Sequence, residues 1–201
     1  MNILLILIQF GGGFYSVAID HDYIVIAYFP EGLDENCKIT ELFDFSDKKV
    51  YHFEKDIINT FDEAVENLAM HEMHSNLKKT NSVFAENLYF LGYSSVKYYE
   101  DCILSNYFLD NGCIEMKLEN VYADVAELDE FITDKRIINL LPWIGNGKQI
   151  NNKNYINIKS TILPMNDMDE PMNSFEVIQI KTTDKIPDYF EQAIKRIKNR
   201  N

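Results

Sequence analysis

Residues 102–141 read CILSNYFLDNGCIEMKLENVYADVAELDEFITDKRIINLL, and this stretch predicts a β-hairpin that leads into a helix. Asn111-Gly112 lies between two apolar-rich runs, and both residues tolerate the positive φ of a two-residue type I′ turn. With that pair as the loop, Asp110 faces Cys113, and the residue numbers of every opposed pair sum to 223. The stretch therefore predicts an antiparallel ladder with a defined register.

This register divides the hairpin side chains between two faces. The largely apolar face places four residues of the first strand, Ile103, Ser105, Tyr107 and Leu109, opposite Asn120, Leu118, Met116 and Ile114. The other face carries Glu115 and Glu119, which we expect to point outward together.

A helix is expected over residues 124–141. Apolar residues recur there at roughly helical spacing, at Val125, Leu128, Phe131, Ile132 and Ile138. Acidic residues step by three, three and four, at Asp124, Glu127, Glu130 and Asp134, so a helix would carry one carboxylate per turn along one stripe. Asp124 and Glu127 also have the spacing of an N-cap and the third helical position. Two interpretations stay open: a capped helix with a solvated face, and a binding surface for a basic partner.

The first 60 residues predict strands. The apolar run from residue 2 to residue 10 indicates a strand buried on both faces. Runs at 14–19 and 23–29 favour a second hairpin, and two further strands are expected at 39–45 and 50–53.

Helix signals occur at two further places. Thr60 and Glu63 match a capping box, which predicts a helix over 60–79. Pro187 predicts the first position of a last helix over 187–199, with Phe190, Ile194 and Ile197 on its apolar face. Residues 83–91 fit either a helix or a strand, whereas 155–163 and 175–181 alternate as strands do.

Length and composition favour one globular domain spanning residues 1–201. The chain is 46% hydrophobic and 25% charged, without a break in composition. The expected fold class is α+β, a largely antiparallel β-sheet with about three helices packed against it.

The net charge of −13 is unevenly distributed. Residues 1–134 carry 25 acidic and 8 basic residues, a net charge of −17, while residues 135–201 carry +4. The first part would repel nucleic-acid phosphates and anionic membranes and attract a cationic protein.

Cysteine usage predicts a cytoplasmic protein. Cys37, Cys102 and Cys113 lack metal or redox spacing and do not form a disulfide framework, so reduced thiols are expected. The apolar run at the start lacks a basic leader and is too short to span a bilayer, and we interpret it as a core strand.

No motif predicts a catalytic, cofactor or metal site. His71 and His74 are three residues apart, whereas the zinc-protease pattern needs four. Gly11–Gly13 precede a further strand instead of the helix that a dinucleotide-binding loop requires. The segment 145–148 lacks the upstream glycine and following Ser or Thr of a phosphate loop.

These observations lead to three functional hypotheses. The first is a non-catalytic acidic protein that neutralises a basic partner, most concretely a bacterial immunity protein or antitoxin bound to a cognate toxin domain. Its expected partner-binding residues are Glu115, Glu119, Glu127, Glu130 and Asp134. The alternatives are a small-substrate enzyme whose site uses scattered acidic residues and His21, His52, His71 or His74, and a structural subunit of the phage-assembly kind.

Overall fold

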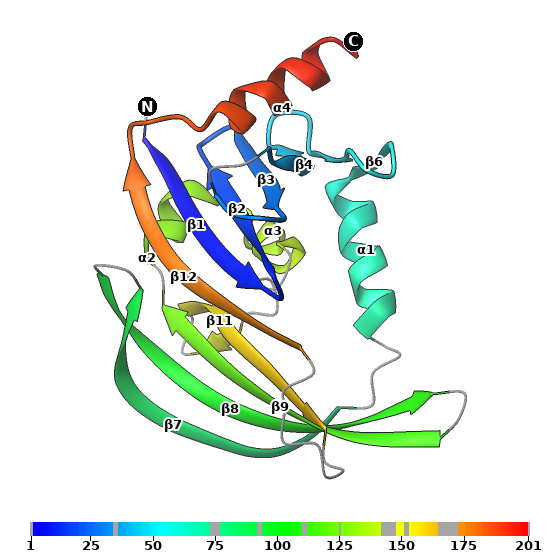
Figure 1. Cartoon of the computed structure of the whole chain (residues 1–201), viewed down its shortest axis with the longest axis vertical. Coiled ribbons are helices and arrows are strands. Elements are labelled where there is room, and N and C mark those ends of the chain that lie inside the picture. The colour runs from blue at the N-terminus through cyan, green and yellow to red at the C-terminus, as the bar shows by residue number, and fades with distance from the viewer. Residues whose placement is uncertain are drawn as a thin grey trace. The chain divides into compact units, whose positions relative to one another are not determined.

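A computed structural model describes residues 2–33, 36–72, 77–91, 94–109, 112–124, 126–141, 148–150, 153–164 and 173–200 (Figure 1). Side chains are described over 2–33, 36–67, 120–123, 128–134, 136–141, 155–161 and 174–200. The fold is α+β, with antiparallel strand pairing and short helices, as the sequence predicts. Among the described residues, no helix is long and apolar enough to cross a membrane.

The chain divides into two compact units. Unit 1 contains residues 1–64, 126–133 and 177–201, and unit 2 contains residues 65–125 and 134–176. The expectation of one domain over residues 1–201 stays a prediction.

The sheet of unit 1 is built from consecutive antiparallel hairpins. Its strands are β1 (Ile3–Phe10), β2 (Gly13–Ile19), β3 (Tyr23–Phe29), β4 (Lys38–Asp44), β5 (Lys49–His52), β6 (Ile57–Thr60) and the second part of β12 (Asn173–Thr183). Strands β1 to β5 confirm the strands predicted in this part of the sequence. Their β-branched and aromatic side chains pack well on a pleated sheet. Gly11 has a φ of 57° in the turn between β1 and β2, a conformation that glycine adopts without strain.

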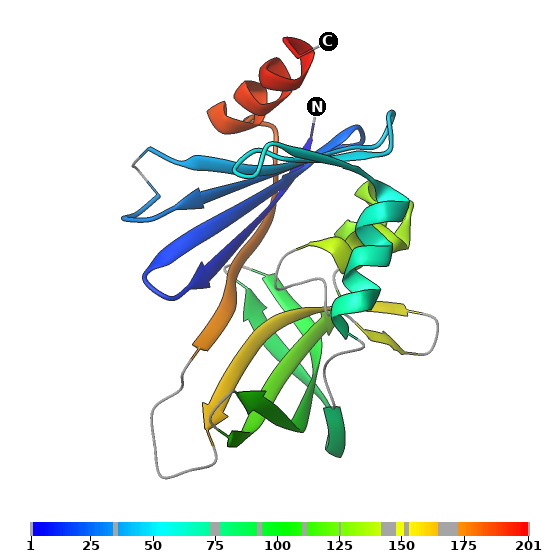
Figure 2. The same cartoon turned by 90° about the vertical axis from the view of Figure 1, so that its right-hand side faces the viewer.

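Helix α4 (Asp188–Lys198) covers one face of this sheet (Figures 1 and 2). The predicted last helix is confirmed, although Pro187 is its N-cap instead of its first residue, and its Phe190 and Ile197 are buried against the strands. Four of the strand residues in this core share one face by alternation, namely Val25, Ala27, Leu42 and Tyr51. The hydrophobic face of α4 therefore completes one core of unit 1.

The opposite face of the sheet is also apolar. Its fully buried residues include Ile6, Val17, Ile24, Ile26 and Phe43. Helix α2 (Ala126–Phe131) packs near β1, and its Phe131 ring stacks on His21 with centroids 5.1 Å apart. Burial on both faces explains the nearly continuous apolar sequence of β1.

Unit 2 consists mainly of longer antiparallel strands. These are β7 (Leu77–Leu91), β8 (Ser94–Leu109), β9 (Gly112–Asp124), β10 (Lys148–Ile150), β11 (Lys153–Pro164) and the first part of β12. Their order is β12-β11-β9-β8-β7, and β10 pairs with β11. Asn157 donates to Asn120 at 3.3 Å between β11 and β9, where both polar side chains are buried.

The structure corrects the predicted hairpin register. Leu109 pairs with Gly112 and Cys102 with Glu119, so paired numbers sum to 221 instead of 223. Asp110 and Asn111, which lie outside the described residues, separate the paired positions instead of Asn111-Gly112. A shift of two residues leaves each side chain on its face, so the apolar pattern could not distinguish the two registers.

Two predicted helices are also corrected. Helix α1 spans Phe61–Glu72, and residues 77–79 belong to β7, so the helix expected over 60–79 is shorter. The helix expected over 124–141 is two helices, α2 and α3 (Lys135–Leu140), while Asp124 ends strand β9. Residues 143–152, whose Gly and Asn residues predict a polar connection, contain strand β10.

Candidate protein-binding site

Strand β6 lies at the edge of the unit 1 sheet and exposes two large apolar side chains. It pairs with β5 through Lys49–Thr60, Val50–Asn59, Tyr51–Ile58 and His52–Ile57, and it ends the strand order. Ile57 is 45% exposed and Ile58 is 48% exposed. We call Ile57–Thr60 the β6 edge.

The backbone of Ile58 faces away from β5. The Phe61 N–H donates to the Lys48 carbonyl at 2.9 Å, and the Phe53 N–H donates to the Thr40 carbonyl at 2.9 Å on the other side of β5. Because hydrogen-bonded pairs alternate along an antiparallel ladder, Ile57 and Asn59 direct their backbone groups toward β5. The N–H and C=O of Ile58 therefore point outward from the sheet.

Both ends of the β6 edge are attached to the rest of unit 1. Phe61, which follows the strand, is buried with its ring 6.4 Å from that of Phe43 and 6.2 Å from that of Phe45. At the other end, Arg200 Nη2 donates to Asp56 Oδ1 at 2.6 Å. The edge is therefore held in place before any partner binds.

The predicted capping box of α1 is confirmed. The Thr60 N–H donates to Glu63 Oε2 at 2.7 Å, and the Glu63 N–H donates to Thr60 Oγ1 at 3.2 Å. The hydrogen bond from the Thr60 backbone lowers the pKa of the Glu63 carboxyl. This bond also occupies the outward N–H of Thr60, which leaves Ile58 as the outward donor within the strand.

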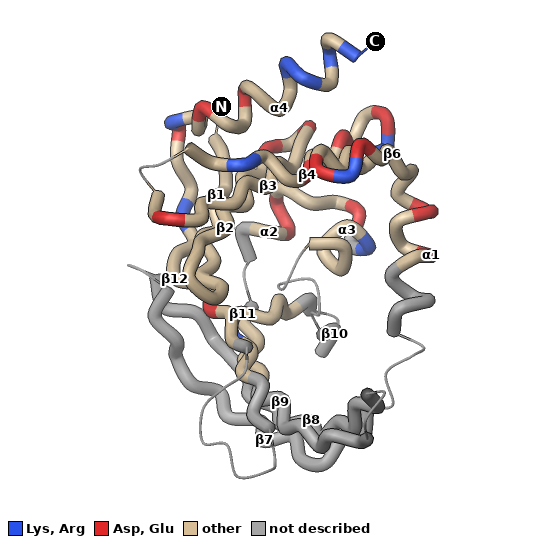
Figure 3. Tube along the Cα trace, turned by 45° about the vertical axis from the view of Figure 1, so that its right-hand side comes forward, with Lys and Arg blue, Asp and Glu red and all other residues tan. Residues whose placement is uncertain are grey.

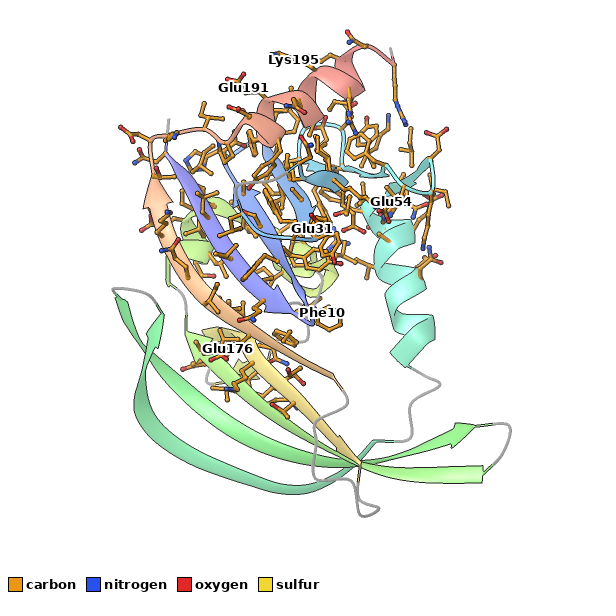
Figure 4. The ribbon with its side chains drawn as sticks, viewed as in Figure 1. Phe10, Glu31, Glu54, Glu176, Glu191 and Lys195 are labelled. Carbon is orange, nitrogen blue, oxygen red and sulfur yellow. The ribbon has the colours of Figure 1, made fainter. Side chains whose placement is uncertain are left out.

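Carboxylates flank the β6 edge at both ends. The exposed residues Glu54, Asp56, Asp62 and Glu63 are together called the acidic flank. Glu54 is labelled in Figure 4. Lys55 is the basic residue between residues 54 and 63. Figure 3 shows acidic residues around β6 and the start of α1, while Lys and Arg residues lie along α4. The edge therefore combines exposed apolar side chains with negative charge.

The expected partner-binding acids do not form one described patch. Glu130 is exposed on α2 in unit 1, and Glu127 lies in the same helix. Glu115 and Glu119 share one face of β9 in unit 2, and their side chains, like that of Glu127, lie outside the described part. Their role in binding stays a prediction.

Asp134 has a local structural role that the helical stripe did not predict. It is the N-cap of α3, accepts from the Arg136 N–H at 3.1 Å, and pairs with Arg136 Nη2 at 2.7 Å. The side chain therefore caps a new helix, and its charge is balanced by an adjacent guanidinium.

The histidines do not converge on one described site. His52 Nδ1 lies 3.0 Å from Glu41 Oε1, and its Nε2 lies 3.4 Å from Asn59 Nδ2, whereas His21 stacks on Phe131. Side chains of residues 71 and 74 lie outside the described part. Within that part, no group of three or more His, Cys, Asp or Glu side chains is arranged to hold a metal ion.

A pocket of about 530 Å³ opens beside the start of α4. Leu5, Phe29 and Ile186 supply apolar walls, and Lys181 and Lys185 contribute positive charge. Cys37 also lines it, and burial raises the pKa of its thiol, which opposes thiolate formation. This thiol is free, as the cysteine pattern predicts.

Sequence reasoning missed the β6 edge. Residues 57–60 show no apolar alternation, since Ile57 and Ile58 are adjacent. The sequence feature that could have indicated this edge is a pair of neighbouring isoleucines directly before a capping box, with acidic residues on both sides.

Comparisons with protein-family models, with curated proteins and with solved structures each find no match.

Proposed function

We propose that this chain is a non-catalytic acidic protein that binds and neutralises a basic protein partner. Its most concrete form is a bacterial immunity protein or antitoxin that inhibits a cognate toxin domain in the cytoplasm. The observation that supports it is the β6 edge, which offers exposed apolar side chains within an acidic flank. Exposed apolar residues surrounded by charge are typical of protein interfaces.

Charge supplies the preference for a cationic partner. The first segment of unit 1, residues 1–64, carries 12 acidic and 4 basic residues. Such a field accelerates association with a basic protein and repels an acidic one, and it weakens as salt screens it. An inhibitor of a basic toxin benefits from fast association, because it must occupy the toxin before the toxin reaches its target.

Coexpression with the product of the directly upstream gene tests this function. We expect that product to be basic, to stop growth when expressed alone, and to be retained by this chain at low salt. Coexpression should then restore growth. A neighbouring product that neither stops growth nor binds at low salt would overturn the immunity role.

Charge variants locate the interface in the same assay. The double variant Glu54→Gln with Asp62→Asn should weaken low-salt binding, because it removes two acids of the flank. A matched control is Asp22→Asn with Asp188→Asn, which also removes one exposed turn acid and one acid from a first helical turn of unit 1. Replacement of Glu127, Glu130 and Asp134 by Lys tests the acidic surface that the sequence predicts. If the flank and control variants lose partner binding to the same extent, overall charge and not this edge determines binding.

One observation favours a small-substrate enzyme as a second candidate. Glu41, His52 and Asn59 form a hydrogen-bonded row across β4, β5 and β6, and a carboxylate-oriented histidine is a common general base. Both ring nitrogens already have partners, so Asn59 would have to leave Nε2 before that atom accepts a proton. If His52→Gln abolishes the growth rescue while retaining partner binding, the enzyme candidate replaces the binding function.

A further inference from the structure

We propose that the β6 edge binds an extended, lysine- or arginine-rich segment of the partner as an added β-strand. This inference rests on the proposed function and specifies how the partner is recognised. Strand addition uses main-chain hydrogen bonds for affinity and alternate side chains for specificity.

The backbone of the edge is prepared for this pairing. The N–H and C=O of Ile58 point away from β5, as the alternation from the Phe61–Lys48 hydrogen bond requires. Buried Phe61 and the pairing with β5 hold the strand in place. An incoming segment therefore meets an ordered strand, and less conformational entropy is lost on binding.

The side chains of the edge define the composition of the segment. Ile57 and Ile58 are adjacent in the strand, so they project from opposite faces and can contact apolar residues on both sides of an added strand. Glu54 and Asp56 lie before the strand, and Asp62 and Glu63 lie after it. A complementary segment therefore has apolar residues at its centre and basic residues at both ends.

The same charges disfavour a second copy of this chain as the occupant. Antiparallel pairing of two β6 edges about Ile58 would bring Glu54 of each copy near Asp62 of the other. Like charges on neighbouring strands are destabilising, and charged residues at sheet edges oppose self-association. A basic partner segment turns each of these repulsions into an attraction.

The binding test uses three synthetic peptides against the full chain. The first has two valines flanked on each side by two lysines, the second replaces each lysine by glutamate, and the third keeps the lysines but replaces both valines by proline. Nuclear magnetic resonance follows the backbone amides at low salt, and amide hydrogen exchange is measured with the first peptide in excess. We expect the first peptide to shift the amides of Ile57–Thr60 and to slow exchange at Ile58, while the glutamate and proline peptides do neither.

Two substitutions at one position separate backbone pairing from surface composition. Ile58→Pro removes the outward N–H while leaving the bonds of Ile57 and Asn59 to β5, and proline is tolerated at sheet edges with this orientation. Ile58→Thr removes exposed apolar surface but keeps the N–H. We expect the proline variant to bind the first peptide about tenfold more weakly than the threonine variant. If Ile58→Pro does not fold, slowed exchange at Ile58 in the unchanged protein decides the question.

The outcomes separate this inference from the function on which it rests. If the lysine–valine and lysine–proline peptides bind equally and exchange at Ile58 is unchanged, strand addition is overturned while recognition of a basic partner stands. If neither lysine peptide binds at low salt, both proposals lose their basis. If sedimentation shows a dimer of the unchanged chain that Ile58→Pro dissociates, the occupant is a second copy and the partner assignment is wrong.

Discussion

The Tyr189 hydroxyl lies 2.8 Å from Oγ of Ser16, and this contact joins α4 to β2 across 173 residues of sequence. Burial raises the pKa of Tyr189 to about 12, although the hydrogen bond to Ser16 opposes this shift. The phenol is thus a buried and hydrogen-bonded anchor for the helix that completes one core of unit 1.

Tyr189→Phe should lower the free energy of unfolding by about 0.5–1.5 kcal/mol, because it removes one hydrogen bond and retains the ring. Because the folded pKa is raised, Tyr189 contributes stability below pH 10 that is lost as pH rises toward 12. Urea unfolding at pH 7 and pH 11 measures both effects. The control is Ser16→Ala in a double-mutant cycle, and additive losses would contradict a direct interaction.

Two substitutions of Asp20 should differ in their effect on the free energy of unfolding. Its Oδ1 accepts the N–H groups of Asp22 at 2.8 Å and Tyr23 at 2.6 Å, and the residue is only 2% exposed. Asp20→Asn keeps this acceptor without the charge, whereas Asp20→Ala removes it and should cost about 1–3 kcal/mol in unfolding free energy.

The pH dependence of Asp20 provides the control. Burial raises its pKa above the ordinary aspartate value, so the folded state holds the proton more tightly than the unfolded chain does. Its contribution to stability is present below the ordinary pKa and is lost as pH rises through the raised one. The stability of Asp20→Asn relative to the unchanged protein should therefore increase from acidic to neutral pH in chemical denaturation. A stability difference between the two proteins that does not change with pH would contradict the raised pKa of Asp20.

Removing the capping box should loosen the end of the β6 edge. Thr60→Ala loses the side-chain acceptor and should cost about 1 kcal/mol, within the usual range for N-caps. Hydrogen exchange should then rise in the first turn of α1. Glu63→Gln tests the reciprocal bond: because the pKa of Glu63 is lowered, its contribution is present at neutral pH and is lost as pH falls through the lowered value. Thr60→Ser, which keeps the hydroxyl, is the control.

Two neighbouring glycines should differ in their tolerance of a methyl group. A Cβ on Gly13 would lie 2.6 Å from the Tyr28 ring, whereas a Cβ on Gly12 has nothing within 4 Å. The Tyr28 ring is also packed against Tyr15 with centroids 4.7 Å apart, which restricts its movement. Gly13→Ala should therefore lower unfolding free energy by about 1–3 kcal/mol, and Gly12→Ala should not. Thermal unfolding measures both effects. If the clash is the cause, adding Tyr28→Ala should remove the destabilising effect of Gly13→Ala.

Arg200→Gln should strengthen binding of a basic partner. Arg200 neutralises Asp56 in an exposed pair, so its loss should change stability by less than about 1 kcal/mol. The freed carboxylate adds negative charge to the acidic flank. Low-salt affinity for the lysine–valine peptide should increase, and Lys195→Gln, which removes a cation of α4 that is paired with Glu191, is the control. Figure 4 shows Glu191 and Lys195 on the outer side of α4. An equal increase in both variants would indicate a general charge effect.

Local signals in the sequence determined much of this protein. The β-branched and aromatic runs predict β1 to β5, Thr60 and Glu63 predict the start of α1, and Pro187 predicts the start of α4, because each depends on groups within a few residues. The acidic composition likewise predicts the sign of the surface around β6.

Only the tertiary structure decided features that depend on distant pairing. Two registers of the β8–β9 hairpin keep the same faces, so cross-strand packing had to select between them. Residues 77–79 fit a continued helix, but β7 satisfies their backbone groups through pairing with β8, and Asp134 begins a new helix where one long helix was expected. The β6 edge exists because Ile57–Thr60 pair with β5 while leaving the backbone of Ile58 outward. These four residues, of which three are exposed, carry no periodic signal, so only the pairing with β5 makes them a candidate binding site.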